Sequence, residues 1–248
     1  MRNRFCGLLL TICAIWPAGA SLALDRINGE ADRSASDKSP AKANDASQAV
    51  EVREFEVRVD NVLRGKHRLI TKFEGKNELA EIQTDVKVDV IVYVYSFKSR
   101  GNETWREGRL VNSEIRVDDN GKKRMFSLTR ESDIQQISFN DKPVKTSKEC
   151  VMSTSYWRLP NAELLSKPMS VVDVDSGKTF NATLIQVGTD TVTVGSRTIS
   201  CRHFKIDGVS PAELWFDDRD RLVKQTSVEQ GHATELRLKT IRTSNDAK

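Results

Sequence analysis

The chain has 248 residues, of which 38% are hydrophobic and 30% charged, and its 39 Lys and Arg residues slightly outnumber its 35 Asp and Glu residues. Charges of both signs are interspersed, without the block of about five or six like charges that marks an interaction tail. This balance excludes the basic surface expected of a nucleic-acid-binding protein.

Residues 1–23 have the pattern of a cleavable signal peptide. Arg2 and Arg4 form a positive start, residues 5–16 are apolar, and small residues follow. A membrane anchor would need about 20 apolar residues, and this run is shorter and ends at Pro17. We therefore expect a periplasmic or secreted protein that meets the membrane only before cleavage. Without the two arginines, 37 basic and 35 acidic residues remain.

The rest of the chain divides by composition. Residues 24–50 are rich in Ala, Ser, Asp and Lys and have no aromatic residue, so we expect a flexible linker. Residues 51–243 consist of short alternating apolar and polar runs and are expected to form a single β-rich domain. Residues 244–248 are expected to be a disordered tail.

Alternation and turn residues predict the fold class. Apolar residues occupy every second position in runs such as 55–59, and turn signals recur along the domain, with Asn120-Gly121 the strongest hairpin signal. Gly188 to Asp190 also suggests a turn between strands. Only the stretch near residues 159–167 has a helical texture, and Pro168 would end it. We predict an all-β fold: a strongly curved, mainly antiparallel sheet or half-open barrel with one short helix near residues 159–167.

The stretch at residues 81–99, "EIQTDVKVDVIVYVYSFKS", begins as a strict alternation and then becomes apolar at nearly every position. Read as one strand, residues 79–97 would be about 60 Å long, at about 3.3 Å per residue. This is longer than a typical strand, so it would have to bend, twist or carry a bulge. The change also suggests that a strand buried on one face becomes buried on both.

Cys150 and Cys201 are the two cysteines that remain after signal cleavage. Export to an oxidising compartment favours a disulfide between them, worth roughly 4 kcal/mol in the chain-entropy model. The alternative is a pair of buried free thiols.

The motifs that would indicate catalysis or metal binding are incomplete. Gly177-Lys178-Thr179 matches the end of a phosphate-binding loop, but the first Gly of that motif is missing and the context is a hairpin. His67, His203 and His232 stand apart, without a second ligand at a metal-binding spacing. We predict no catalytic residues, no cofactor and no metal, and a non-enzymatic protein is the favoured hypothesis.

Aromatic residues offer the most informative candidate site. Large aromatics ordinarily fill a core, and that is the favoured interpretation. The alternative is an apolar cavity with a few polar groups at its mouth. For that case the ligand-binding candidates are Tyr93, Tyr95, Trp105, Tyr156 and Trp157.

The segment "TSYWRLP" at residues 154–160 adds a resemblance. Together with "FEVRVDNVLRGKHRL", "DVDSGKTF" and "ELWFDDRDRLVKQ", in this order, it resembles domain-of-unknown-function family 6134, a family of uncharacterised exported bacterial proteins. The likeness covers roughly residues 53–240. Asn61 stands where a Gly is expected, and Cys201 where a small residue is usual. The family implies a β-rich exported protein without an established activity, similar in fold to half-barrel periplasmic carriers of lipoproteins and lipids.

Three functions follow from these expectations. The first is an exported, non-enzymatic envelope protein that binds or carries a lipid or other apolar ligand on its concave face. The second is a structural or protein-interaction module of the envelope with a filled core. The third, an envelope hydrolase, would need a cluster of catalytic side chains that the linear sequence does not place.

Overall fold

The structure is a computed structural model, and it describes residues 50–90, 93–131, 134–144, 149–208, 211–229 and 231–244. The expected signal peptide at 1–23 lies outside the described residues, as do the expected linker apart from Val50 and the expected tail after Ser244. Within the described part, no helix is long and apolar enough to cross a membrane.

Fifteen strands and one short 3-10 turn make up the described chain. The first eight strands are β1 Glu51–Val59, β2 Val62–Glu74, β3 Asn77–Val90, β4 Tyr93–Arg106, β5 Arg109–Asp119, β6 Lys122–Glu131, β7 Ile134–Phe139 and β8 Lys142–Pro143. The remaining elements are β9 Cys150–Ser153, η1 Ala162–Leu164, β10 Pro168–Val172, β11 Thr179–Val194, β12 Arg197–Gly208, β13 Ala212–Phe216, β14 Leu222–Glu229 and β15 His232–Thr243.

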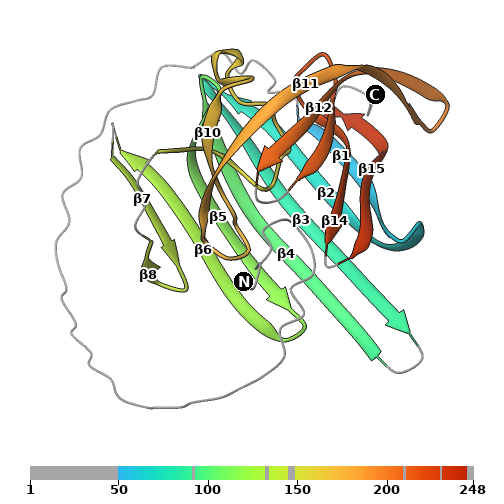
Figure 1. Cartoon of the computed structure of the whole chain (residues 1–248), viewed down its shortest axis with the longest axis horizontal. Helices are drawn as coiled ribbons and strands as arrows, with labels where there is room; N and C mark the ends of the chain where they lie inside the picture. The colour runs from blue at the N-terminus through green and yellow to red at the C-terminus, as the bar shows by residue number, and fades with distance from the viewer. Residues whose placement is uncertain are drawn as a thin grey trace, which may run out of the picture.

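All the strands belong to one sheet, in the order β8-β7-β6-β5-β4-β3-β2-β1-β15-β14-β13-β12-β11-β10-β9. Every neighbouring pair is antiparallel except β9 and β10, which are parallel. The sheet folds over itself, so that β10 and β11 cross β3 to β6 (Figure 1), and it does not close into a barrel. The predicted all-β, mainly antiparallel fold is confirmed.

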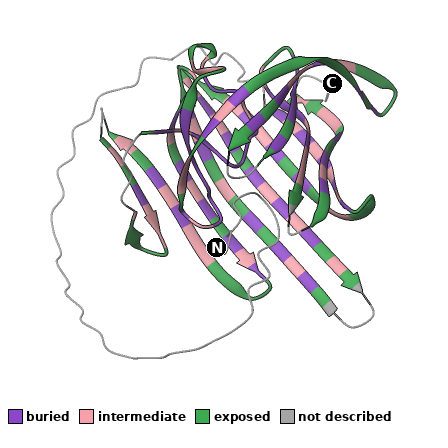
Figure 2. Ribbon diagram, viewed as in Figure 1, coloured by how far each residue is buried: buried purple, intermediate pink, exposed green. Residues whose placement is uncertain are grey.

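Side-chain alternation gives the sheet an inner and an outer face. Along β1 the burial pattern alternates at every residue, and Figure 2 shows buried and exposed positions alternating along β3 and β4. The inner face carries a single hydrophobic core, to which both halves of the sheet contribute residues such as Phe55, Phe97, Phe126, Phe204 and Phe216. Burying each such side chain contributes about 1.5–3 kcal/mol.

The interpretation of residues 81–99 as one strand is wrong. The chain reverses between Val90 and Tyr93, which pair with each other, so that Val86 lies opposite Phe97. The inward positions are even-numbered in β3 and odd-numbered in β4. This change of phase across a two-residue connection explains the apolar run. Among the described residues of this stretch the second face is not buried: Val94 on the outer face is 50% exposed.

Of two further turns that the sequence predicts, the structure confirms one and corrects the other. Asn120 (φ 50°) and Gly121 (φ 87°) form the predicted tight hairpin turn between β5 and β6, a left-handed conformation that Asn and Gly favour. The expected turn at Gly188 to Asp190 is wrong, because β11 runs through these residues with an irregularity between Gln186 and Gly188. The bulge lets the strand continue through the residues at which the sequence predicts a turn.

The expected short helix near residues 159–167 is reduced to the 3-10 turn η1. Asn161 caps it by accepting a hydrogen bond from the Glu163 amide, and the chain is extended again at Leu165. Pro160 and Pro168 leave too few residues for a helix, whose first turn is costly to nucleate.

The expected disulfide is also absent. Cys150 and Cys201 are both buried free thiols. They lie on β9 and β12, and β10 and β11 separate these strands. Three strand spacings of about 4.8 Å exceed the Cα separation that a disulfide can bridge. Burial raises the pKa of both thiols, that of Cys201 to about 11 with a further contribution from Asp217 and Asp190.

Two glycines mark places where neighbouring strands approach very closely. A Cβ atom on Gly65 would lie 2.3 Å from the carbonyl oxygen of Asp85, and one on Gly101 would lie 2.2 Å from that of Glu114. No other residue fits such distances, so these positions let β2 and β4 follow the bend of the sheet.

Side chains join the folded-over edge to the first half of the sheet. The Gln135 amide on β7 both accepts from the Cys150 backbone N–H and donates to its carbonyl, at 2.8 Å each. Arg130 on β6 forms an ion pair with Glu149 beside it. The Gln135 side chain therefore forms the pair of hydrogen bonds with Cys150 that a neighbouring strand's backbone would form, and so links β7 to β9.

Candidate functional site

The inner face is organised around a buried carboxylate, Glu103 on β4, which is 1% exposed. Its Oε1 accepts hydrogen bonds from the hydroxyls of Ser153 (2.6 Å), Ser155 (3.0 Å) and Ser113 (3.5 Å). Its Oε2 accepts from the indole nitrogens of Trp105 (3.0 Å) and Trp157 (2.6 Å). Five donors thus surround one carboxylate, which satisfies the strong requirement of a buried acid for partners.

The Glu103 cluster fills space rather than enclosing it. The Trp105 and Trp157 rings meet edge to face with centroids 5.9 Å apart, and the Arg158 guanidinium lies 5.9 Å from the Trp105 centroid. Residues 153–157 are the end of β9 and the chain just after it, so these contacts hold that segment against β4. None of the three hollows described below is lined by Glu103, Trp105 or Trp157, and the contacts of this cluster are those of a structural junction.

The predicted ligand-binding residues do not gather at one place. Trp105 and Trp157 meet at Glu103, and Tyr156 is buried in the same segment with a positive φ of 49°. Tyr95 donates a 2.7 Å hydrogen bond to Asp119, about 33 Å along β4 from Trp105 by strand rise. The side chain of Tyr93 lies outside the described part. Ligand binding by these residues stays a prediction.

Sequence reasoning did not identify Glu103, although a signal was present. Odd-numbered residues of β4 point inward, and Glu103 falls in that phase between Ser99 and Trp105. An acid at an inward position indicates either a buried partner set or a site. Only the correct placement of the hairpin at residues 90–93 reveals that phase.

A second network consists of arginines that form ion pairs with buried carboxylates. Its members are Arg53, Arg221, Arg158, Glu51, Glu78 and Asp217. Arg221 contacts Glu51 at 2.9 Å and Glu78 at 3.1 Å, and Arg53 contacts Glu51 at 2.6 Å. Burial tends to raise the pKa of Glu51, but Arg53 and Arg221 outweigh it and hold that pKa below its ordinary value. We call this network the inner arginine cluster.

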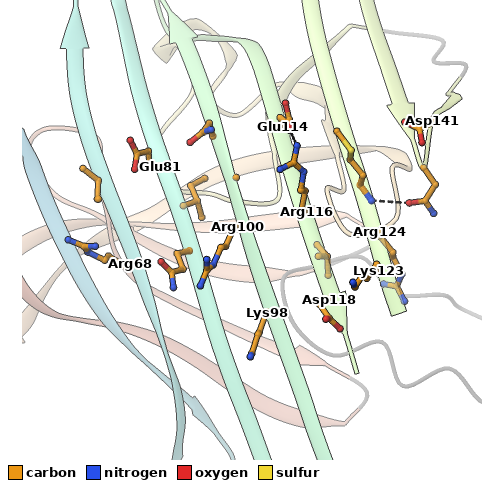
Figure 3. Close-up of a pocket in the computed structure, with 18 residues that line it drawn as sticks. Arg68, Glu81, Lys98, Arg100, Glu114, Arg116, Asp118, Lys123, Arg124 and Asp141 are labelled. Atoms are coloured by element: carbon orange, nitrogen blue, oxygen red, sulfur yellow. Dashed lines mark hydrogen bonds and ion pairs between the residues drawn. The ribbon is translucent and has the colours of Figure 1, made fainter. Parts of the chain in front are cut away.

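The large hollows lie on the outer face instead. One of about 840 Å³ extends over β2 to β6, and most of the side chains that line it are outward-facing polar residues of these strands (Figure 3). A second, of about 810 Å³, extends over β1 to β3 and shares Arg68 and Gln83 with the first. We call the two together the outer trough. A third hollow, of about 360 Å³, lies beside β12 to β15.

The histidines take three separate roles. His67 is buried, and desolvation lowers its pKa to about 4, while its Nδ1 lies 2.8 Å from Thr84 Oγ1. His203 stacks on Trp215 at 4.2 Å, and His232 lies 2.7 Å from Asp60. Among the described residues, no group of three or more His, Cys, Asp or Glu side chains is arranged to hold a metal ion.

The segment at Gly177-Lys178-Thr179 is a turn, as the sequence indicates. The Gly177 amide donates to the carbonyl oxygen of Asp173, and Gly177 has a φ of 67°. The Asp173 side chain accepts from the Asp175 amide at 3.0 Å. These bonds are local and leave no phosphate-binding loop.

This architecture is that of a β-barrel-like protein. The solved structure of a β-barrel-like protein of domain of unknown function DUF1849, from Brucella abortus, is similar with a TM-score of 0.55 and 9% sequence identity; the match covers 80% of this chain and 98% of that chain. At this identity the likeness shows the fold alone.

The amino-acid sequence identifies the family to which the chain belongs. The model of DUF6134, a domain of unknown function, matches residues 55–239, and the chain belongs to this family. The resemblance carried by "TSYW" and its companion segments is thereby confirmed. No curated protein matches the chain.

Proposed function

We propose that the protein is an exported, non-enzymatic binding module with a filled interior, and that its partner binds in the outer trough. This is the interaction-module function among those that the sequence suggested. Export rests on the signal-peptide pattern of residues 1–23.

One observation supports this proposal most strongly. Trp105 and Trp157, expected at the mouth of a cavity, instead donate hydrogen bonds to Glu103 and pack against each other, while the two hollows of the outer trough open on the opposite face. A carrier of an acyl chain needs a continuous apolar cavity of at least about 300 Å³. The outer trough has the volume, but ten of the eighteen residues that line its first hollow carry a charge, so the lining is not continuously apolar.

The first test separates a filled module from an apolar carrier. The protein is purified after export, its lipids are extracted for mass spectrometry, and a fluorescent fatty acid is titrated into it. We expect neither a co-purified lipid nor saturable fatty-acid binding. One acyl chain per protein, displaced by the fluorescent probe, would contradict the proposal and favour the apolar carrier.

The second test concerns the outer trough. A photo-crosslinking amino acid replaces Gln83, at the junction of the two hollows, or Arg197, an exposed residue of the distant β11–β12 hairpin. In cells that naturally produce the protein, we expect light-dependent products from position 83 and none from position 197. Equal products, or none, at the two positions would contradict an interaction surface in the trough.

A further inference from the structure

The outer trough contains an unusual row of arginines. Arg68 on β2, Gln83 on β3, Arg100 on β4 and Arg116 on β5 lie opposite one another in register. Their side chains project from the same face, as Figure 3 shows for Arg68, Arg100 and Arg116. With neighbouring strands about 4.8 Å apart, three guanidinium groups fall within roughly 15 Å across the sheet. We call these four residues the arginine row.

The neighbouring row has balanced charges, whereas the arginine row does not. Next to it, charges alternate in register from β2 to β6: Lys66, Asp85, Lys98, Asp118 and Lys123. The arginine row holds no acid. Arg100 lies directly opposite Arg116, and like charges in that position repel each other and weaken the pairing of the strands.

Nearby acids do not neutralise the row completely. Glu114 pairs with Arg116 at 2.6 Å, but Arg68 and Arg100 make no ion pair with any residue in the described part of the chain. Glu54 is opposite Arg68 on β1, yet its carboxylate pairs with Arg242. Two guanidinium groups therefore remain available at the floor of the first hollow.

We propose that the arginine row binds a ligand that carries two or more phosphate groups. Guanidinium groups match tetrahedral oxyanions through paired N–H donors, and the Gln83 amide between Arg68 and Arg100 can add another donor. Arg68 and Arg100 are two strand spacings apart, about 10 Å, so that separate anionic groups of one ligand can reach both. A hollow of about 840 Å³ has room for such a ligand.

This inference rests on the proposed use of the outer trough and names the chemistry of its ligand. Inorganic tripolyphosphate, as a diffusible probe, is titrated into the exported protein by calorimetry. In parallel, flotation measures binding to phosphatidylcholine vesicles with and without about one third cardiolipin, a lipid with two phosphate groups, as a membrane-bound source. The variants are Arg100→Gln, Arg100→Lys and, as the matched control, Arg197→Gln, which removes one exposed positive charge far from the row.

We expect saturable binding that Arg100→Gln weakens at least tenfold, Arg100→Lys weakens less, and Arg197→Gln leaves within twofold of wild type. This pattern with tripolyphosphate supports a diffusible ligand, and the same pattern with anionic vesicles alone supports a lipid headgroup. No binding to either probe, or equal losses in Arg100→Gln and Arg197→Gln, would overturn the inference. Crosslinks from position 83 that persist despite such a result would leave the trough as an interaction surface and exclude only the phosphate ligand.

Discussion

Arginines occur in two groups on opposite faces of the same sheet, and their surroundings differ. In the inner arginine cluster, Arg53 and Arg221 are at most 4% exposed, and each contacts carboxylates. In the arginine row, Arg68 and Arg100 are exposed and contact none among the described residues. A charge removed from water must be paired, whereas an exposed charge need not be. The comparison separates arginines that hold the fold from arginines that remain available to a ligand.

The inner cluster should show the largest effect on stability. Arg221→Met leaves Glu51 and Glu78 buried with fewer cations, so we expect the free energy of unfolding to fall by about 3–5 kcal/mol. Arg219→Met is the matched control, since Arg219 also contacts Glu51 but its side chain is 66% exposed. Its loss should stay below about 1 kcal/mol. Urea unfolding followed by tryptophan fluorescence measures both, and similar losses would contradict the distinction.

His67 should give the next largest effect, as a dependence on pH. Its pKa is about 4 in the folded protein and about 6.5 unfolded, so as pH falls the unfolded chain binds the proton first. Its contribution is therefore present above about pH 6.5 and is lost between there and pH 4, by about 3 kcal/mol. His67→Gln should lose this part of the acid sensitivity. A variant whose stability falls as steeply as that of wild type over this range would refute the assignment.

Gly101 tests whether the bend beneath the arginine row needs a residue without a side chain. Gly101→Ala should cost about 1–3 kcal/mol, because the new methyl group would meet the Glu114 carbonyl. Gly188→Ala is the control, since nothing lies within 4 Å of a Cβ there. That substitution should change stability by less than about 1 kcal/mol. Thermal unfolding of the two variants checks the difference, which would vanish if the strands could spread without cost.

The arginine row should have little effect on the stability of the unliganded protein. Arg100→Gln removes a like-charge pair with Arg116, so we expect a change within about 0.5 kcal/mol, neutral or stabilising. Urea unfolding without phosphate measures it. A loss of more than about 2 kcal/mol would place Arg100 among the structural arginines.

The smallest effect concerns the cysteines. Because Cys150 and Cys201 are free, a reducing agent should leave the free energy of unfolding unchanged. Both thiols are buried with raised pKa values, so alkylation should be slow in the folded protein and fast after unfolding. Mass spectrometry of the two peptides counts the label, and a peptide pair joined by a disulfide would contradict the fold.

Local signals predicted part of this fold and nonlocal contacts decided the rest. Asn120-Gly121 specifies its hairpin because those residues favour left-handed backbone conformations. The reversal between Val90 and Tyr93 carries no such residue, so the strands on either side looked like one. The expected helix is reduced to η1 for a local reason, because Pro160 and Pro168 leave few residues between them and the first turn of a helix is costly to nucleate.

Both candidate sites depend on the β3–β4 hairpin, which the sequence alone predicts to be one continuous strand. The positions of Glu103 and Arg100 on opposite faces follow from the phase of β4, and the arginine row exists only in the register that aligns four strands. A slip of one residue would turn Arg100 inward. Sequence alone identified the aromatic residues but could not show that a carboxylate gathers two of them.

The most direct measurement is the gain in unfolding free energy that tripolyphosphate produces. At ten times its dissociation constant, the ligand should stabilise the wild-type protein and Arg197→Gln by about 1.4 kcal/mol, since it binds only the folded state. Arg100→Gln should gain much less at the same concentration. An equal gain in Arg100→Gln, or none in the wild-type protein, would contradict the claim that the unpaired outer arginines form the binding site.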